Sequence, residues 1–230
     1  MTQQLALDLP GRVDFSVDSF IRGDANREAV TALERWRDWP AGAFALVGPP
    51  GSGKSHLAAI WAQQSGARMT TLHALESVLD QLEPGAALVV EDADRGGSET
   101  ALFHAFNRAA EGDLPALLLS ARLPPAQWGA ELPDLVSRLR ALPQVTLHEP
   151  DDDLLTQLIQ KQLNDRHAPI KPGVIEYLLP RMERSVAAAR TLVDLLDKRA
   201  LVKRTPITRA VAREVLAELN PDAPDPGDGE

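Results

Sequence analysis

The residues with the clearest chemical meaning lie in one glycine-rich segment that ends in a lysine and a serine. It consists of Gly48, Pro49, Pro50, Gly51, Ser52, Gly53, Lys54 and Ser55, and it matches the pattern G-x-x-x-x-G-K-[ST] in full. Glycines in this pattern let backbone N–H groups face phosphate oxygens, and the start of a following helix adds a partial positive charge. We expect Lys54 to reach the β- and γ-phosphates of a nucleotide and the Ser55 hydroxyl to bind Mg²⁺. The alternative is a glycine-rich turn that contains a lysine by chance, which leaves the full spacing unexplained.

Two adjacent carboxylates at the end of an apolar run are suited to complete such a site. Glu91 and Asp92 directly follow the run 88–90. We expect Glu91 to lie next to the metal and Asp92 to orient or deprotonate an attacking water. Aspartate is the usual residue at the first position, and the longer Glu91 side chain weakens the tight octahedral geometry that Mg²⁺ demands. The pair also suits solvated turn carboxylates, so the sequence leaves hydrolysis in this chain's own site open.

The elements that must position these groups alternate through the first 150 residues. Short apolar runs typical of buried strands cover 43–47, 69–72, 87–90, 116–119 and 145–148. Segments with helical periodicity lie before and between them, at 26–36, 55–64, 75–82 and 99–110. This alternation predicts parallel βαβ units whose sheet is covered on both faces.

The pattern changes after Pro150, where only helical periodicity remains. Helices are expected over 154–163, 172–179, 186–200 and 209–219. Ser185 and Thr208 precede the last two and are suitable N-caps. The chain is therefore expected to contain an α/β domain followed by a small all-α domain, and then a disordered acidic tail over 220–230.

Composition narrows the class of protein further. The chain of 230 residues is 44% hydrophobic, contains no cysteine, and its five histidines show no paired metal-ligand spacing. It has neither an apolar run of about 20 residues, as a membrane span needs, nor a secretory signal at the N-terminus. A cytoplasmic location is therefore expected. The net charge of −9 removes the long-range attraction that drives non-specific DNA binding, so DNA is expected to be met only indirectly.

The order of these motifs resembles the AAA+ ATPases, and more narrowly the DnaA-related branch of that family. Segment 18–26 is similar to the family's adenine-lining segment, which implies that Phe20 and Ile21 contact the nucleotide. Segment 119–125 is similar to the sensor I strand, which implies that Ser120 senses the γ-phosphate. A polar strand terminus is the equal alternative for Ser120.

Two arginines take their expected roles from the same resemblance. Segment 132–139 is similar to the one that carries an arginine finger, which implies that Arg138 acts in the ATP site of another subunit. A surface arginine on a polar helix is the alternative. Segment 189–192 resembles the lid motif whose arginine touches the nucleotide. Helix geometry turns Arg190 about 200° from Leu192, a position that suits either the nucleotide or water.

The N-terminal segment 4–9 is similar to the short peptide with which such proteins bind the DNA polymerase III sliding clamp. Leu5, Leu7 and Leu9 would enter a hydrophobic pocket, and Gln4 would supply a polar anchor. The alternative is a strand that packs on the protein's own core. The initiators carry a helix-turn-helix domain after the lid, whereas here only the acidic tail follows. The resemblance therefore favours the short, Hda-like regulators over the initiators.

Taken together, the sequence predicts a P-loop AAA+ parallel sheet flanked by helices, followed by a small all-α lid. The expected divisions are a clamp-binding peptide at 1–11, the α/β base at 12–150, the lid at 151–219 and the tail at 220–230. By resemblance, the chain would bind ADP or ATP, with Mg²⁺, and stimulate ATP hydrolysis by the initiator DnaA. Alternatives are an autonomous ATPase such as a helicase loader, or a non-enzymatic adaptor stabilised by nucleotide. Self-association is compatible with any AAA+ module.

Overall fold

The α/β part of the molecule is built on a parallel sheet. The computed structural model describes residues 21–220, and within them five strands pair in the order β2-β3-β4-β1-β5. The strands are β1 (Ala43–Val47), β2 (Arg68–Thr71), β3 (Leu88–Glu91), β4 (Leu117–Ala121) and β5 (Gln144–Thr146), and every pairing is parallel. The carboxyl ends of β1, β3 and β4 therefore meet at one edge of the sheet, where ligands bind in open α/β sheets.

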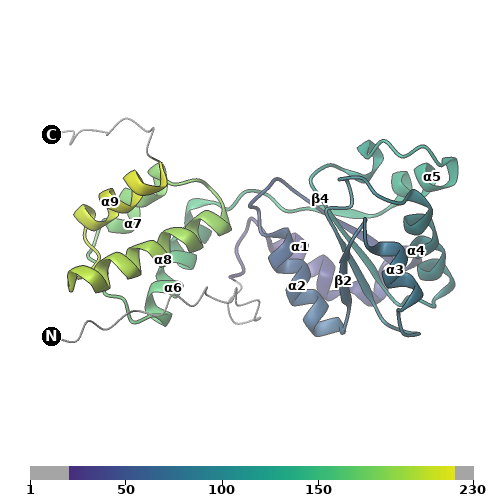
Figure 1. Ribbon diagram of the computed structural model, residues 1–230, viewed down its shortest axis with the longest axis horizontal. Helices are drawn as coiled ribbons and strands as arrows, with labels where there is room; N and C mark the ends of the chain where they lie inside the picture. Colours follow the sequence, from purple (N-terminus) through teal and green to yellow (C-terminus); the bar gives the residue numbers. More distant parts are fainter. Residues whose placement is uncertain (1–20, 221–230) are drawn as a thin grey trace.

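Helices cover both faces of this sheet (Figure 1). They are α1 (Arg27–Glu34), α2 (Lys54–Ser65), α3 (Leu75–Asp80), α4 (Glu99–Glu111) and α5 (Pro133–Ala141), with 3₁₀ turns at Trp36–Asp38, Pro40–Gly42 and Pro125–Gln127. Alternate residues of β3 belong to two different apolar cores on the two faces of the sheet. Val89 packs with α1 and α2, whereas Leu88 and Val90 pack with α3, α4 and α5. A strand buried on both faces must be apolar throughout, and β3 is apolar up to Glu91.

A separate helical domain, here called the lid, follows the base. It consists of α6 (Asp152–Asp165), α7 (Val174–Leu178), a 3₁₀ turn at Leu179–Arg181, α8 (Val186–Lys203) and α9 (Arg209–Leu219), and it has its own apolar core. The Ser185 hydroxyl accepts a hydrogen bond from the Ala188 N–H, and the Thr208 hydroxyl accepts one from the Val211 N–H. Both predicted N-caps are thereby confirmed.

The predicted fold class is confirmed, a parallel sheet flanked by helices and followed by a small helical lid. Strand β1 and helix α9 begin and end at the predicted residues. The structure adds helix α5. The apolar pattern does not single it out, because only two of its nine residues, Leu135 and Leu139, are buried. Segment 1–11 with the predicted clamp-binding peptide, Phe20, and residues 221–230 of the predicted tail lie outside the described residues, so these predictions are not tested.

Candidate functional site

The phosphate loop lies between the end of β1 and the start of α2. Val47 ends the strand and Lys54 begins the helix. Gly51 and Gly53 have φ angles of 76° and 99°, a region that disfavours residues with a Cβ. Gly53 is the N-cap residue of α2. The loop therefore brings backbone groups to the positive end of a helix dipole, as a phosphate site requires.

Lys54 is folded back over this loop. Its side-chain amine donates hydrogen bonds to the carbonyl oxygens of Gly48 and Pro49, at 2.7 and 2.8 Å, and the residue is 8% exposed. Burial lowers the pKa of Lys54 below its ordinary value, against the opposing effect of nearby carboxylates that begins with Asp92. A buried cation of this kind gains from an added phosphate, which supplies the charge partner that the loop carbonyls lack.

The acidic pair lies at the carboxyl end of β3, as the sequence predicts, but its two members are held differently. Glu91 has one carboxylate oxygen, Oε1, that is buried and has no hydrogen-bond partner among residues 21–220. The Asp92 carboxylate forms an exposed ion pair with Arg95, at 3.2 Å. Glu91 is thus the member with an acceptor oxygen left over for a ligand.

Ser120 ties the ends of β3 and β4 together. The residue is 1% exposed, its hydroxyl accepts the Asp92 N–H at 3.2 Å, and its carbonyl accepts the Ala93 N–H at 2.8 Å. These bonds hold the backbone at Asp92, which has a φ of 49°. Ser120 therefore has a structural task in the arrangement of the acidic pair, whether or not it also contacts a nucleotide.

Asp94 belongs to the same edge of the sheet and was not singled out by the sequence. One of its oxygens, Oδ2, accepts the N–H groups of Arg122 and Leu123 at 2.9 and 3.1 Å. The other oxygen, Oδ1, is buried without a partner among the described residues. The signal available in the sequence is its place in the acidic run after β3, two residues beyond Asp92.

The N-terminus of α8 brings the lid against the phosphate loop. The Val186 N–H donates to the Gly51 carbonyl at 3.1 Å. A Cβ placed on Gly51 would lie 2.4 Å from the Cβ of Ser185, so only glycine fits at this contact. One turn further along α8, Arg190 Nη2 lies 3.2 and 3.3 Å from the two ring nitrogens of His56, which is 7% exposed. Arg190 and His56 line one hollow together with Lys54 and Ser55.

An adjoining hollow between base and lid has mostly apolar walls. These include Ile21, Leu147, Leu154, Leu158 and Val186, and Arg190 and His56 lie at the side toward the phosphate loop. The Asn26 side chain fixes the entering segment, because it donates to the Ile21 carbonyl at 2.8 Å and accepts the Gly23 N–H at 3.0 Å. Apolar walls next to a phosphate loop suit a purine base.

Arg138 lies elsewhere. Its helix, α5, is at the end of the base farthest from the lid (Figure 1). The phosphate loop instead contacts the lid, through the Val186 N–H at the start of α8. Its Nη2 donates to Asn107 Oδ1 at 2.6 Å, and its guanidinium carbon is 5.3 Å from the centre of the Phe103 ring. The structure therefore brings Lys54, Ser55, Ile21 and Arg190 together and keeps Arg138 apart from them.

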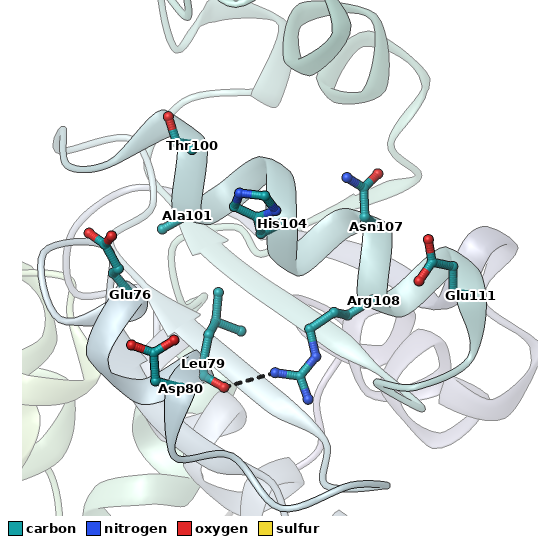
Figure 2. A pocket seen from close by; sticks show the side chains of 9 residues that line it. All are labelled: Glu76, Leu79, Asp80, Thr100, Ala101, His104, Asn107, Arg108 and Glu111. Atoms are coloured by element: carbon teal, nitrogen blue, oxygen red, sulfur yellow. Dashed lines mark hydrogen bonds between the residues drawn. The ribbon is translucent and has the colours of Figure 1, made fainter.

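A further hollow lies between α3 and α4, and Figure 2 shows the side chains around it. Its carboxylates are Glu76, Asp80 and Glu111, and Arg108 reaches across to the Leu79 carbonyl at 2.9 Å.

Within residues 21–220, no group of three or more His, Cys, Asp or Glu side chains is arranged to hold a metal ion. In the same range, no helix is both long and apolar enough to cross a membrane.

No protein-family model matches the chain. Among solved structures, it is similar to domain III of the replication initiation protein DnaA from Thermotoga maritima, with 18% identity, a TM-score of 0.72, and coverage of 91% of this chain and 98% of that one. It is also similar to a replication initiator DnaA bound to AMPPCP and single-stranded DNA, with 22% identity, coverage of 84% and 69%, and a TM-score of 0.64. The RuvB Holliday junction branch migration motor of Thermotoga maritima matches with 22% identity, coverage of 90% and 72%, and a TM-score of 0.70. These likenesses show that the chain has the AAA+ fold of DnaA and RuvB.

Proposed function

We propose that this chain is an Hda-like negative regulator of chromosomal replication initiation, which stimulates ATP hydrolysis by DnaA. The observation that carries the proposal is the separation of its two candidate sites. Lys54 and Arg190 line a hollow at the lid end of the base, whereas Arg138 lies on α5 at the opposite end. An arginine in that position is suited to the nucleotide site of another chain and not to its own.

The chain's own site would hold an adenine nucleotide, ADP in this proposal. The phosphate-loop N–H groups and Lys54 would bind its phosphates, Ile21 and the apolar wall its base, and Arg190 would connect it to the lid. The Glu91 oxygen that is buried without a partner among residues 21–220 and the exposed Ser55 hydroxyl fit a Mg²⁺ ion that completes its coordination with phosphate oxygens and water. When bound, Mg²⁺ neutralises phosphate charge. The solved DnaA structure with AMPPCP supports the choice of an adenine nucleotide.

Arg138 would act on the initiator's ATP. Its guanidinium carries a permanent positive charge and a planar fork of N–H donors that matches phosphate oxygens. Placed against the γ-phosphoryl group bound by DnaA, it would stabilise the charge that develops as the phosphoryl group is transferred to water. The initiator would be left with ADP, in its inactive form.

Segment 4–9 would bring the regulator to newly replicated DNA. Its leucines and Gln4 resemble a clamp-binding peptide, and docking on the DNA polymerase III sliding clamp left on replicated DNA would supply the proximity to DNA. The net charge of −9 supports this indirect route, because the chain lacks the electrostatic attraction for direct, non-specific DNA binding.

The test is the hydrolysis of ATP bound to DnaA, measured with ADP and clamp loaded on DNA. We expect the wild-type chain to stimulate hydrolysis, and Arg138→Ala to reduce the stimulation by about 10³-fold, the lower range for an arginine finger. Removal of residues 1–9 should abolish the clamp-dependent stimulation. Arg140→Ala is the matched control, since Arg140 is an exposed arginine on the same helix. An Arg138→Ala protein with the wild-type rate would overturn the finger assignment.

A second candidate function is an autonomous ATPase such as a helicase loader. It is favoured by a complete phosphate loop together with the Glu91 oxygen that is buried without a partner in the described part of the chain. It predicts robust ATP turnover by the isolated chain and loss of that turnover in Glu91→Gln. A non-enzymatic adaptor would instead show nucleotide-dependent stability with no effect on hydrolysis by DnaA and no turnover of its own.

A further inference from the structure

Arg138 is held by two side chains of one neighbouring helix. Asn107 Oδ1 accepts a hydrogen bond from Arg138 Nη2 at 2.6 Å, and the guanidinium carbon lies 5.3 Å from the centre of the Phe103 ring. Asn107 and Phe103 are four residues apart on α4, a spacing that puts them on the same face of a helix. Helix α4 therefore offers Arg138 an acceptor and an aromatic surface side by side.

These two contacts use only a small part of the hydrogen-bonding capacity of the guanidinium. A guanidinium has five N–H donors in one plane, and the bond to Asn107 uses one of them. The contact with the Phe103 ring is electrostatic and uses none in a conventional hydrogen bond. All three residues are half-buried, so the arginine is neither sealed in the core nor extended freely into water.

We propose that Asn107, assisted by Phe103, is a positioning residue that holds Arg138 ready for a phosphate in the partner's nucleotide site. This inference rests on the proposed function, because it gives the arginine finger its support within the chain. An arginine that is ordered before the encounter loses less side-chain freedom when it binds phosphate. The support should therefore raise the rate of stimulated hydrolysis and change the affinity of the two proteins little.

Asn107 also lines the hollow between α3 and α4, so a role in shaping that hollow must be separated from a role in holding Arg138. Figure 2 shows Thr100 and Asn107 on α4, with His104 between them. Thr100 is exposed and lines the same hollow. Thr100→Ala is therefore the matched control for a change to the hollow that leaves the Arg138 hydrogen bond in place.

The experiment compares Asn107→Leu, Asn107→Asp, Thr100→Ala and Arg138→Ala in the full chain. The readout is the hydrolysis of DnaA-bound ATP, with ADP and DNA-loaded clamp, over a range of regulator concentrations. We expect Asn107→Leu to lower the maximal stimulation about three- to tenfold, the cost of ordering one long side chain, with little change in the half-saturating concentration. Thr100→Ala should retain the wild-type maximum. Asn107→Asp keeps the acceptor oxygen but adds a negative charge beside Arg138 that opposes phosphate, so it is compared in the readout below, which does not depend on phosphate.

A second readout does not depend on the partner. The order parameter of the Arg138 side-chain Nε–H, measured by ¹⁵N relaxation, should fall in Asn107→Leu and stay high in Asn107→Asp. If leucine destabilises the contact between α4 and α5, Asn107→Ala removes the acceptor without added bulk and should give the same fall.

The outcomes separate this inference from the function on which it rests. Wild-type stimulation and an unchanged order parameter in Asn107→Leu, beside an inactive Arg138→Ala, would overturn the positioning role and leave the finger intact. An equal fall of the order parameter in Asn107→Asp and Asn107→Leu would also overturn it, because the acceptor would then be irrelevant. Wild-type stimulation by Arg138→Ala would instead overturn the finger itself.

Discussion

The two ends of the base hold their candidate phosphate-binding residues with different parts of the chain. At the lid end, backbone groups make the key contacts, since the Lys54 amine bonds to two loop carbonyls and the Val186 N–H bonds to the Gly51 carbonyl. At the far end, one side chain holds another, Arg138 on Asn107. A backbone site depends on glycine positions and strand order, whereas a side-chain site depends on which residues two helices happen to bring together.

This difference implies that substitutions at one end of the base should not affect the function of the other end. They share none of the contacts described above, and substitutions at well-separated sites without shared partners usually have additive effects. A variant at the lid end should therefore change nucleotide binding and leave the order of the Arg138 side chain unchanged. The predictions below test the lid end, beginning with the largest expected effect.

Lys54→Met should weaken nucleotide binding strongly. The variant deletes the one buried cation of the phosphate loop, and loss of a buried charge partner weakens binding by about 30-fold or more. Stability of the nucleotide-free protein should change little, because relief of the cost of burying a charge opposes the loss of two hydrogen bonds. Calorimetric titration with ADP and thermal unfolding measure the two effects. Lys161→Met, which alters an exposed lysine ion pair on α6, should bind ADP as the wild type does.

The pH dependence of ADP binding checks the same assignment. Burial lowers the pKa of Lys54 from an ordinary value of 10.5. Between the lowered and the ordinary pKa, the folded protein binds fewer protons than the unfolded chain, so the stability of the nucleotide-free protein should rise with pH in that window. Phosphate favours the charged amine, so ADP affinity should be constant below the lowered pKa and fall above it. A pH dependence that persists in Lys54→Met would assign the titration to another group.

The same contrast explains what could be predicted from the sequence. The phosphate loop, the acidic pair and strand β1 follow from spacing along the chain, and the structure has them where they were expected. The contact of Arg190 with His56 joins residues 134 positions apart, and no local sequence pattern predicts such a pair. Asn107 was likewise not predictable, because it gains its meaning only when α5 packs on α4.

Gly51→Ala should loosen the contact between lid and loop. Both Gly51 and Gly66 have positive φ angles, 76° and 71°, so alanine at either costs about 1–2 kcal/mol in backbone strain. A Cβ at Gly66 would meet no atom of the described residues within 4 Å, but a Cβ at Gly51 would lie 2.4 Å from that of Ser185. Denaturant unfolding should show a similar strain cost in both variants, with a further loss in Gly51→Ala. ADP affinity should fall only in Gly51→Ala, and equal affinities would argue against a lid seated on the loop.

The two confirmed N-caps of the lid allow a test with the smallest expected effect on ADP binding. Ser185→Ala and Thr208→Ala each delete a capping hydroxyl, at the start of α8 and α9 respectively, and each should cost the lid about 1 kcal/mol of stability. Only α8 begins at the phosphate loop and carries Arg190. Ser185→Ala should therefore weaken ADP binding, by no more than about fivefold, the equivalent of the whole cap energy. Thr208→Ala should leave ADP affinity unchanged, because its cap stabilises the lid far from the loop. An equal loss of ADP affinity in both variants would mean that the stability of the lid alone, and not the start of α8, controls nucleotide binding.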